Sequence, residues 1–248
     1  MNISSKRIRR IFPDGRFVEK DILVLNEHKL SVRVNGMLFC NLVCTGENLM
    51  ELVAGHLLSS GLIEKKSEIS SIFFCETKNN ATVFLSKDFE WNENAKSEES
   101  CCPKNEQFLK IENSLPPEKL PPVDYKPEWI FALANAFSSD GVVHKYTSGT
   151  HICILARKGK PVFTAEDIGR HTALDKALGY MLLNDIPPCD AMIFTSGRVP
   201  VDMVEKVIRA RVGILVSKSV PTSDSLSLAK KYGLKLFFRA WPDSYDCG

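Results

Sequence analysis

The chain has 248 residues, of which 32 are basic and 30 acidic, giving a formal net charge of +2. This length is sufficient for one large domain or two small ones, and the near balance of charge gives no overall field that would attract nucleic acid or an anionic membrane. No window approaches the roughly 20 apolar residues of a membrane-spanning helix, and no apolar signal-peptide segment follows the basic N-terminal residues. We therefore expect a cytoplasmic protein with neither nucleic acid nor membrane among its partners.

Residues 1–113 predict a smaller, β-rich α+β domain. The Asn35-Gly36 dipeptide lies between two apolar runs, as is typical of a tight β-hairpin. Thr45 is a suitable N-cap for the helical pattern that follows, and Gly61 a suitable terminator. In chain order we expect a basic N-terminal arm or strand edge, a hairpin at residues 30–39, a helix ending near Gly61, strands at residues 71–76 and 82–86, and a long mobile loop at residues 88–113.

A proline-rich linker at residues 114–127 follows this domain. Its five prolines interrupt both helices and sheet ladders. From residue 128 onward strands alternate with helices, which is typical of an α/β domain with a largely parallel sheet. The predicted elements are helices at residues 128–138, 167–183, 201–211 and 223–232, and strands at residues 151–156, 191–195, 213–217 and 234–238. In such sheets ligands bind outside the carboxyl ends of the strands.

The segment E-D-I-G-R-H-T-A-L-D-K at residues 166–176 has the densest chemistry in the chain. Glu166 and Asp167 suit the positive end of a helix dipole, whereas Arg170 and His171 lower stability there unless an anion or the carboxylates offset them. A phosphate would also suit this helix start, because Gly169 and its neighbours offer backbone N–H groups and Arg170 a forked contact. Two interpretations stay open: an anion site, and an internal Asp–Arg–His hydrogen-bond network.

Two further strand-to-helix junctions carry polar side chains. Ser196-Gly197-Arg198 combines a hydroxyl, a glycine that allows close backbone approach and a second forked cation. The next junction adds the hydroxyls of Ser217 and Thr222. Ordinary turns with helix caps account for each junction taken alone. Together, the three junctions predict a site for a ligand that bears phosphates.

With these junctions the chain resembles the formate dehydrogenase accessory sulfurtransferase family, the FdhD type, over about residues 12–245. The resemblance rests on T-S-G-T-H at residues 147–151, on residues 166–176, on T-S-G-R at residues 195–198 and on S-V-P-T at residues 219–222. It implies a cytidine-deaminase-like three-layer α/β/α domain at residues 128–248.

The resemblance also implies a function. Such a carrier takes sulfur from a cysteine desulfurase, holds it as a cysteine persulfide, and passes it to the molybdenum bis(molybdopterin guanine dinucleotide) cofactor. The cofactor then enters the formate dehydrogenase apoenzyme. GDP is the expected surrogate ligand, and a homodimer is left open. The alternative is a non-catalytic chaperone that binds the molybdenum cofactor and has lost persulfide chemistry.

The predicted cofactor site combines the three junctions with the C-terminal aromatic stretch, which matches the family only with a shifted spacing. Its residues are Glu166, Asp167, Gly169, Arg170, His171, Ser196, Gly197, Arg198, Thr222, Phe237, Phe238, Arg239, Ala240, Trp241 and Pro242. Within this set we expect the two arginines to contact phosphates. We expect His171 to be an orienting partner of Asp167, Asp175 or the ligand.

The predicted catalytic residues are Cys101 and Cys102. The family places Ser-Cys-Gly-x-Cys-Gly in its mobile loop, whereas this chain has Cys101 at the first cysteine, Cys102 at a glycine position and Lys104 at the second cysteine. We therefore expect Cys101 to carry the persulfide. Cys75 and Cys153 lie in apolar runs and are predicted to be buried, inert thiols. The His-x-Glu and Pro-Cys-x-x-Cys motifs of zinc deaminases are absent from the sequence, so no zinc is expected.

Overall fold

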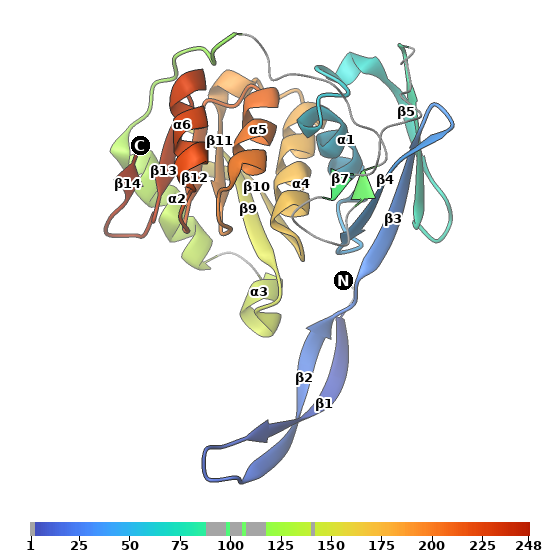
Figure 1. The fold of residues 1–248 in the computed structure, drawn as a ribbon, viewed down its shortest axis with the longest axis vertical. Helices are drawn as coiled ribbons and strands as arrows, with labels where there is room; N and C mark the ends of the chain where they lie inside the picture. The colour runs from blue at the N-terminus through green and yellow to red at the C-terminus, as the bar shows by residue number, and fades with distance from the viewer. Residues whose placement is uncertain (1–2, 88–97, 100–105, 108–117, 140–141) are drawn as a thin grey trace.

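A computed structural model describes residues 3–87, 98–99, 106–107, 118–139 and 142–248. Cys101 and Cys102 lie outside the described residues. The strands form three sheets, and a ribbon of two strands extends away from the body of the molecule (Figure 1). No described helix is long and apolar enough to cross a membrane.

The ribbon pairs β1 (Ile3–Ile11) with β2 (Phe17–Leu25) in antiparallel register along all nine residues. The predicted basic arm is therefore one strand of a long hairpin. Gly15, with a φ of 83°, supplies the left-handed backbone of its turn. Neither strand contributes a residue to the buried hydrophobic clusters of the described chain.

The second sheet has the order β5-β6-β3-β4-β8-β7. Its strands are β3 (His28–Val34), β4 (Met37–Cys44), β5 (Ile69–Phe74), β6 (Asn80–Leu85), β7 (Glu98–Glu99) and β8 (Glu106–Gln107). The predicted hairpin is confirmed, because β3 and β4 are joined by Asn35 and Gly36 with φ values of 46° and 87°. Both residues are left-handed, as the tight turns of hairpins require.

The third sheet has the order β10-β9-β11-β12-β13-β14. Its strands are β9 (His151–Arg157), β10 (Lys160–Asp167), β11 (Ala191–Thr195), β12 (Ile214–Ser217), β13 (Lys235–Phe238) and β14 (Asp246–Cys247). Only the β11–β12 and β12–β13 pairs are parallel, so the predicted largely parallel sheet is wrong. Lys158 and Gly159, both at positive φ, fold β10 back onto β9 as an antiparallel hairpin that the prediction missed. The α/β class itself is confirmed.

Helices cover both faces of this third sheet. The described helices are α1 (Leu49–Ser59), α2 (Pro127–Ser139), α3 (Val142–Thr147), α4 (Arg170–Leu183), α5 (Val201–Arg209) and α6 (Ser223–Tyr232). Alternate residues of β9 point to opposite faces. Ile152 and Ile154 pack in a cluster with Ile130 of α2, whereas Cys153 and Leu155 pack in the larger cluster that contains residues of α4, α5 and α6. The domain is thus a three-layer α/β/α arrangement (Figure 1).

Helices α1 and α4 cross at two glycines. A Cβ atom on Gly55 would lie 1.8 Å from the carbonyl oxygen of Asp175, and one on Gly179 would lie 1.8 Å from that of Glu51. The helix backbones therefore touch, and only glycine fits at either position. The larger hydrophobic cluster contains residues of both six-stranded sheets, from Leu30 to Leu236. The division of the chain at residues 114–127 stays a prediction about its organisation.

Candidate cofactor site

The site lies where the start of α4 meets the turn between β11 and α5. Gly197 in that turn is buried against the side chain of Arg170, because a Cβ atom there would lie 2.9 Å from the Cβ atom of Arg170. Thr195 accepts a hydrogen bond from the Gly197 amide at 3.2 Å, and the Ser217 hydroxyl donates to the Gly197 carbonyl at 2.8 Å. The glycine thus brings Arg170 together with the turn that carries Arg198.

Histidines extend this positive region. His151, the first residue of β9, has Nδ1 3.4 Å from the hydroxyl of Ser196, which accepts a hydrogen bond from the amide of Ile152 at 3.0 Å. Burial lowers the pKa of His151, and the nearby charge of Arg170 lowers it further, with smaller effects from His144, His171 and Arg198. We call Arg170, Arg198, His144, His151 and His171 the cationic cluster. Arg170 and Arg198 supply the permanent positive charge of this cluster, and the lowered pKa of His151 favours its neutral form. An anion bound there would be attracted by the arginines and would favour protonation of His151.

Glu166 fixes the turn before β9. Its Oε2 atom accepts hydrogen bonds from the amide of His144 at 3.0 Å and from the hydroxyl of Thr150 at 3.3 Å. His144 Nδ1 also lies 2.7 Å from the carbonyl oxygen of Thr150. The carboxylate of Glu166 therefore holds the T-S-G-T-H turn, in which Ser148 has a φ of 52°, beside the cationic cluster.

Asp167 lies beneath the site in a buried network. Its side chain and that of Lys176 are both 0% exposed, with 2.6 Å between Oδ2 and Nζ. Thr45 contributes its amide at 3.1 Å and its hydroxyl at 3.2 Å to the same carboxylate oxygen, and the hydroxyl of Thr172 donates to the other at 2.7 Å. Gly169 also donates its amide to Oδ1, at 3.2 Å. Asp167 thus fixes the strand-to-helix turn that presents Arg170.

The predicted helix start was wrong by three residues. Glu166 and Asp167 end strand β10, and α4 begins at Arg170 after Gly169 as its N-cap. The two carboxylates therefore lie before the helix rather than in its first turn. They belong to the strand because its neighbour β9 pairs with both of them, Glu166 with Ile152 and Asp167 with His151.

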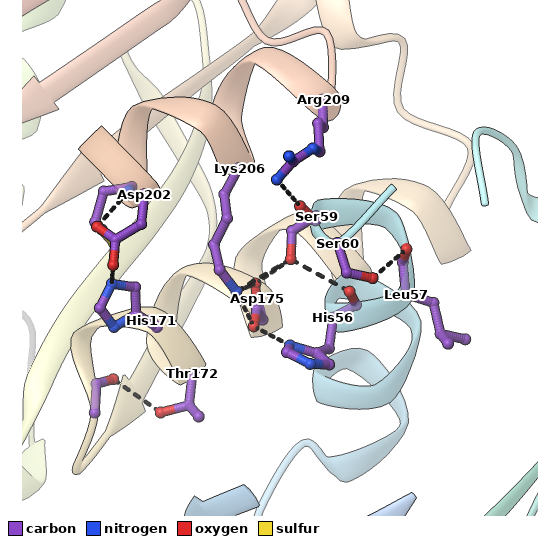
Figure 2. Close-up of polar contacts among 12 residues, drawn as sticks. His56, Leu57, Ser59, Ser60, His171, Thr172, Asp175, Asp202, Lys206 and Arg209 are labelled. Carbon is purple, nitrogen blue, oxygen red and sulfur yellow. Dashed lines mark hydrogen bonds and ion pairs between the residues drawn. The ribbon is translucent and has the colours of Figure 1, made fainter. Parts of the chain in front are cut away.

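Two ionic contacts join α4 to α5 (Figure 2). The second contact lies four residues after the first on both helices. His171 Nε2 lies 2.9 Å from a carboxylate oxygen of Asp202. One turn further, Lys206 Nζ lies 2.6 Å from Asp175. His171 therefore contacts Asp202, which was not among its predicted partners.

Asp175 also binds α1. Ser59 donates its hydroxyl to Oδ1 at 2.6 Å, and His56 Nδ1 lies 2.9 Å from Oδ2 (Figure 2). Burial alone would raise the pKa of Asp175, but the charge of Lys206 and the hydrogen bond with His56 lower it overall. The carboxylate stays ionised, and three helices meet on it.

The C-terminal stretch reaches the same edge of the sheet through Ser217. The carbonyl of Ser217 accepts a hydrogen bond from the amide of Ala240 at 3.0 Å, while its hydroxyl binds Gly197. Exposed Trp241 faces the ammonium of Lys218, which lies 4.8 Å from its ring centre and 4.9 Å from that of Phe137. Trp241 thus follows the segment that Ser217 holds at this edge of the sheet, and its side chain is partly exposed.

The other predicted residues of this stretch are divided between core and surface. Phe237 is buried against Tyr125 and Tyr245, and Phe238 is half-buried. Arg239 forms an ion pair with Asp246, and Pro242 is exposed. Thr222 is the N-cap of α6, where its hydroxyl accepts a hydrogen bond from the amide of Ser225 at 3.2 Å. In this structure the Thr222 hydroxyl therefore caps a helix.

The described cysteines divide by exposure. Cys153 is buried, as predicted, and burial raises its pKa. Cys75 is exposed, contrary to prediction, because it follows the last residue of β5 and lies in the turn to β6. Hydrogen bonds with Thr77 and from the amide of Asn80 lower its pKa to about 7. No group of three potential metal ligands occurs in the part of the chain that the structure describes.

Sequence reasoning did not place His144, His151 or Asp202 in the site. His151 closes the T-S-G-T-H motif at the start of a strand, which was a usable signal. Asp202 gave no such signal, because its contact with His171 depends on the packing of two helices.

A sequence profile of the FdhD/NarQ family matches residues 25–247. The chain belongs to this family. A protein of Halalkalibacterium halodurans named sulfur carrier protein FdhD is 34% identical over 227 residues, covering 89% of this chain and 84% of that protein. The protein of the same name from Bacillus pumilus is 32% identical over 94% of this chain and 90% of its own length.

A solved structure has the same fold. The crystal structure of a putative formate dehydrogenase accessory protein from Desulfotalea psychrophila matches with a TM-score of 0.83 and 26% identity, covering 99% of this chain and 96% of that one. The match includes nearly all of the chain, so the agreement concerns both six-stranded sheets as well as the helices around them.

Proposed function

We propose that this FdhD/NarQ protein is a sulfur carrier that binds a guanine-dinucleotide molybdenum cofactor as its substrate and supplies sulfur to it before the cofactor enters formate dehydrogenase. The observation that carries the proposal is the cationic cluster at one sheet edge, where Arg170 packs on Gly197 and His151 lies beside Ser196, the two residues that precede Arg198. Two relatives are named sulfur carrier proteins, and a structural neighbour is titled a formate dehydrogenase accessory protein. These names support the role of a sulfur carrier that serves formate dehydrogenase.

Each part of such a substrate has a matching feature in the site. Arg170 and Arg198 offer forked, charge-assisted contacts to a diphosphate. The N-terminus of α4 adds a helix dipole, and its N-cap, Gly169, has no side chain to cover the backbone N–H groups of the first turn. Trp241 offers a ring on which guanine or pterin stacks, and Lys218 holds that ring from one side.

The sulfur step belongs to Cys101 in this proposal. A Cys101 thiolate attacks the outer sulfur of a persulfide on a cysteine desulfurase, so that one S–S bond forms while another breaks and the donor thiolate leaves. The resulting persulfide is the sulfur source for the cofactor. In sequence, Cys101 lies between β7 and β8, which pair with each other, and β8 pairs with β4 at Cys40 and Asn41.

Titration calorimetry with GDP tests the binding half of the proposal. Arg170→Ala and Arg198→Ala should each weaken GDP binding by about 10- to 150-fold, since a hydrogen bond to a charged group contributes roughly 1.5–3 kcal/mol. Arg157→Ala is the matched control, because Arg157 lies at the far end of β9 in an exposed pair with Asp190. Wild-type affinity in both site variants would remove the proposed phosphate contacts.

Sulfur loading tests the carrier half. The protein is incubated with a cysteine desulfurase and cysteine, alkylated, and mapped by mass spectrometry. We expect one labile sulfur on Cys101, which is lost in Cys101→Ala and kept in Cys102→Ala. The reverse result would assign the sulfur to Cys102. If the double variant still matures formate dehydrogenase, the protein is a cofactor-binding chaperone without persulfide chemistry.

A further inference from the structure

The two faces of the β1–β2 ribbon differ in charge. Antiparallel partners share a face of a ribbon, so the register assigns each side chain to one face or the other. One face carries Ile3, Ser5, Arg7, Arg9 and Ile11 of β1 opposite Leu25, Leu23, Asp21, Glu19 and Phe17 of β2. Its arginines are neutralised within the ribbon, because both Arg7 and Arg9 form ion pairs with Glu19.

The opposite face has positive charge without acidic residues. It carries Ser4, Lys6, Ile8 and Arg10 of β1 opposite Val24, Ile22, Lys20 and Val18 of β2. We call it the cationic arm face. Three cations alternate there with four aliphatic side chains. The carboxylates of the ribbon lie elsewhere: Glu19 and Asp21 are on the first face, and Asp14 is in the turn.

The ribbon has little support of its own. It contributes to neither hydrophobic cluster of the described chain, Val18 is 53% exposed, and Figure 1 shows the ribbon extending away from both larger sheets. An isolated two-stranded ribbon is marginally stable in water. Exposed apolar side chains on such an element, Val18 on the cationic arm face and Ile11, Phe17 and Leu23 on the first face, indicate that the ribbon binds a partner. The charge of the cationic arm face then distinguishes it from the first face.

The base of the ribbon lies beside the candidate site. β2 packs against α3, and the Leu25 side chain approaches Gly149 of the T-S-G-T-H turn, where a Cβ atom would lie 3.1 Å from it. Glu166 holds that turn next to the cationic cluster. A protein bound along the ribbon is therefore brought to the side of the molecule where the proposed cofactor site lies.

We propose that the cationic arm face docks the enzyme that takes up the finished cofactor, through an acidic surface on that enzyme that also carries apolar side chains. This inference rests on the proposed function, since it names the partner of the same site. The charge of the face requires an acidic partner, and the position of the ribbon's base favours the protein that receives the cofactor.

The size of the face argues against a lasting dimer formed through it. Nine residues per strand give a length of about 30 Å, and two strands a width of about 10 Å, so one face offers roughly 300 Å². A stable interface buries about 800 Å² on each partner. The face alone is too small for a lasting dimer, and it suits the transient contact of a delivery step.

Interferometry with purified formate dehydrogenase apoenzyme tests this inference. The variant Lys6→Gln/Arg10→Gln/Lys20→Gln removes the charge of the cationic arm face. The matched control Arg7→Gln/Arg9→Gln/Arg16→Gln removes three charges from the first face and the turn. We expect the first variant to bind the apoenzyme at least 10-fold more weakly than wild type and the control to stay within about 3-fold. Both should keep wild-type GDP affinity, because the changes are outside the cationic cluster.

Several results would overturn the inference. These are wild-type binding in the first variant, equal loss in both variants, or a wild-type protein that binds GDP and accepts sulfur but not the apoenzyme. That last result would leave the proposed function intact, whereas absence of GDP binding and of sulfur loading would remove the proposed function itself. A dimer that dissociates only in the first variant would assign the face to a second copy. Charge-dependent binding to duplex DNA or anionic vesicles, without binding to the apoenzyme, would assign it to those partners.

Discussion

Two lysines, the buried Lys176 and the half-buried Lys206, hold the residues around the candidate site in place. Lys176 neutralises Asp167 in the turn that presents Arg170, and Lys206 neutralises Asp175 where three helices meet. A buried ion pair contributes little net stability relative to apolar residues of the same volume, but removal of one partner leaves an uncompensated charge. These lysines therefore fix the geometry of the site more than they stabilise the fold.

Lys176→Met should lower the free energy of unfolding by about 3–5 kcal/mol, because the Asp167 carboxylate would remain buried without its cation. Urea denaturation followed by circular dichroism measures this. Lys160→Met, on an exposed position of the adjacent strand, should change stability by less than about 0.5 kcal/mol. The double variant Asp167→Asn/Lys176→Met should recover part of the loss, since no charge is then buried. A single variant as stable as wild type would show that Asp167 finds other compensation.

The buried imidazole of His56 should make stability dependent on pH. Burial lowers the pKa of His56 in the folded protein, although its hydrogen bond with Asp175 acts in the opposite direction. The unfolded chain therefore takes up a proton near pH 6.5 that the folded protein does not, and stability falls as the pH decreases below that value.

His56→Gln keeps a hydrogen-bond donor for Asp175 but does not titrate. We expect the stability of wild type relative to this variant to fall by up to about 1.4 kcal/mol per pH unit between pH 6.5 and 5. Chemical denaturation at several pH values measures the two slopes. Equal slopes for wild type and variant would mean that His56 takes up its proton equally in both states.

Side chains that have distant partners were the hardest to predict. Thr45 has the sequence signature of a helix cap, yet α1 begins at Leu49 after Asn48, and the Thr45 hydroxyl binds Asp167 instead. The local pattern favoured a cap because the competing partner lies more than a hundred residues away in sequence. The pairing of Arg170 with the Gly197 turn was predictable, since both follow strands of one sheet.

At the scale of elements, most helices and strands of the α/β half were predictable. Helix α6 and strand β11 have the predicted bounds, because a Thr cap, a C-terminal Gly and a continuous apolar run mark them clearly. Strand β10 was missed because its polar end, Glu166-Asp167, has the composition of a helix start. Its pairing with β9 outweighed that local preference.

The crossing of α1 and α4 is the element contact most sensitive to volume. Gly55→Ala should destabilise the protein by about 3 kcal/mol, the upper end of the usual cost of overpacking, because the added carbon meets backbone, which cannot rotate away. Gly46→Ala is a suitable control: its nearest contact would be the His28 ring at 3.5 Å, an ordinary distance, and we expect a change below about 1 kcal/mol. Thermal unfolding compares the two. A small effect of Gly55→Ala would mean that the helices separate without loss of packing.

At the scale of the whole molecule, stability should be distributed unevenly. Amides of β11 and β12 lie in the centre of a covered sheet, whereas those of β1 and β2 lie in a ribbon outside the core. Hydrogen exchange measured by mass spectrometry should show complete exchange of the ribbon at times when β11 and β12 are still protected. A ribbon protected as strongly as the central strands, in a dilute sample, would indicate support that the fold does not show.

The glycine crossing also has a consequence for synthesis on the ribosome. Gly179 is made about 120 residues after Gly55. At a translation rate of roughly 5–20 residues per second, α4 is synthesised about 6–24 seconds after α1, whose backbone it contacts in the folded protein. During that interval the face of α1 that carries Gly55, His56 and Ser59 lacks the helix against which it packs in the folded protein. The nascent chain thus exposes the α4-binding face of α1 for a time in which chaperones can bind. Slower translation over α4 would lengthen that exposure.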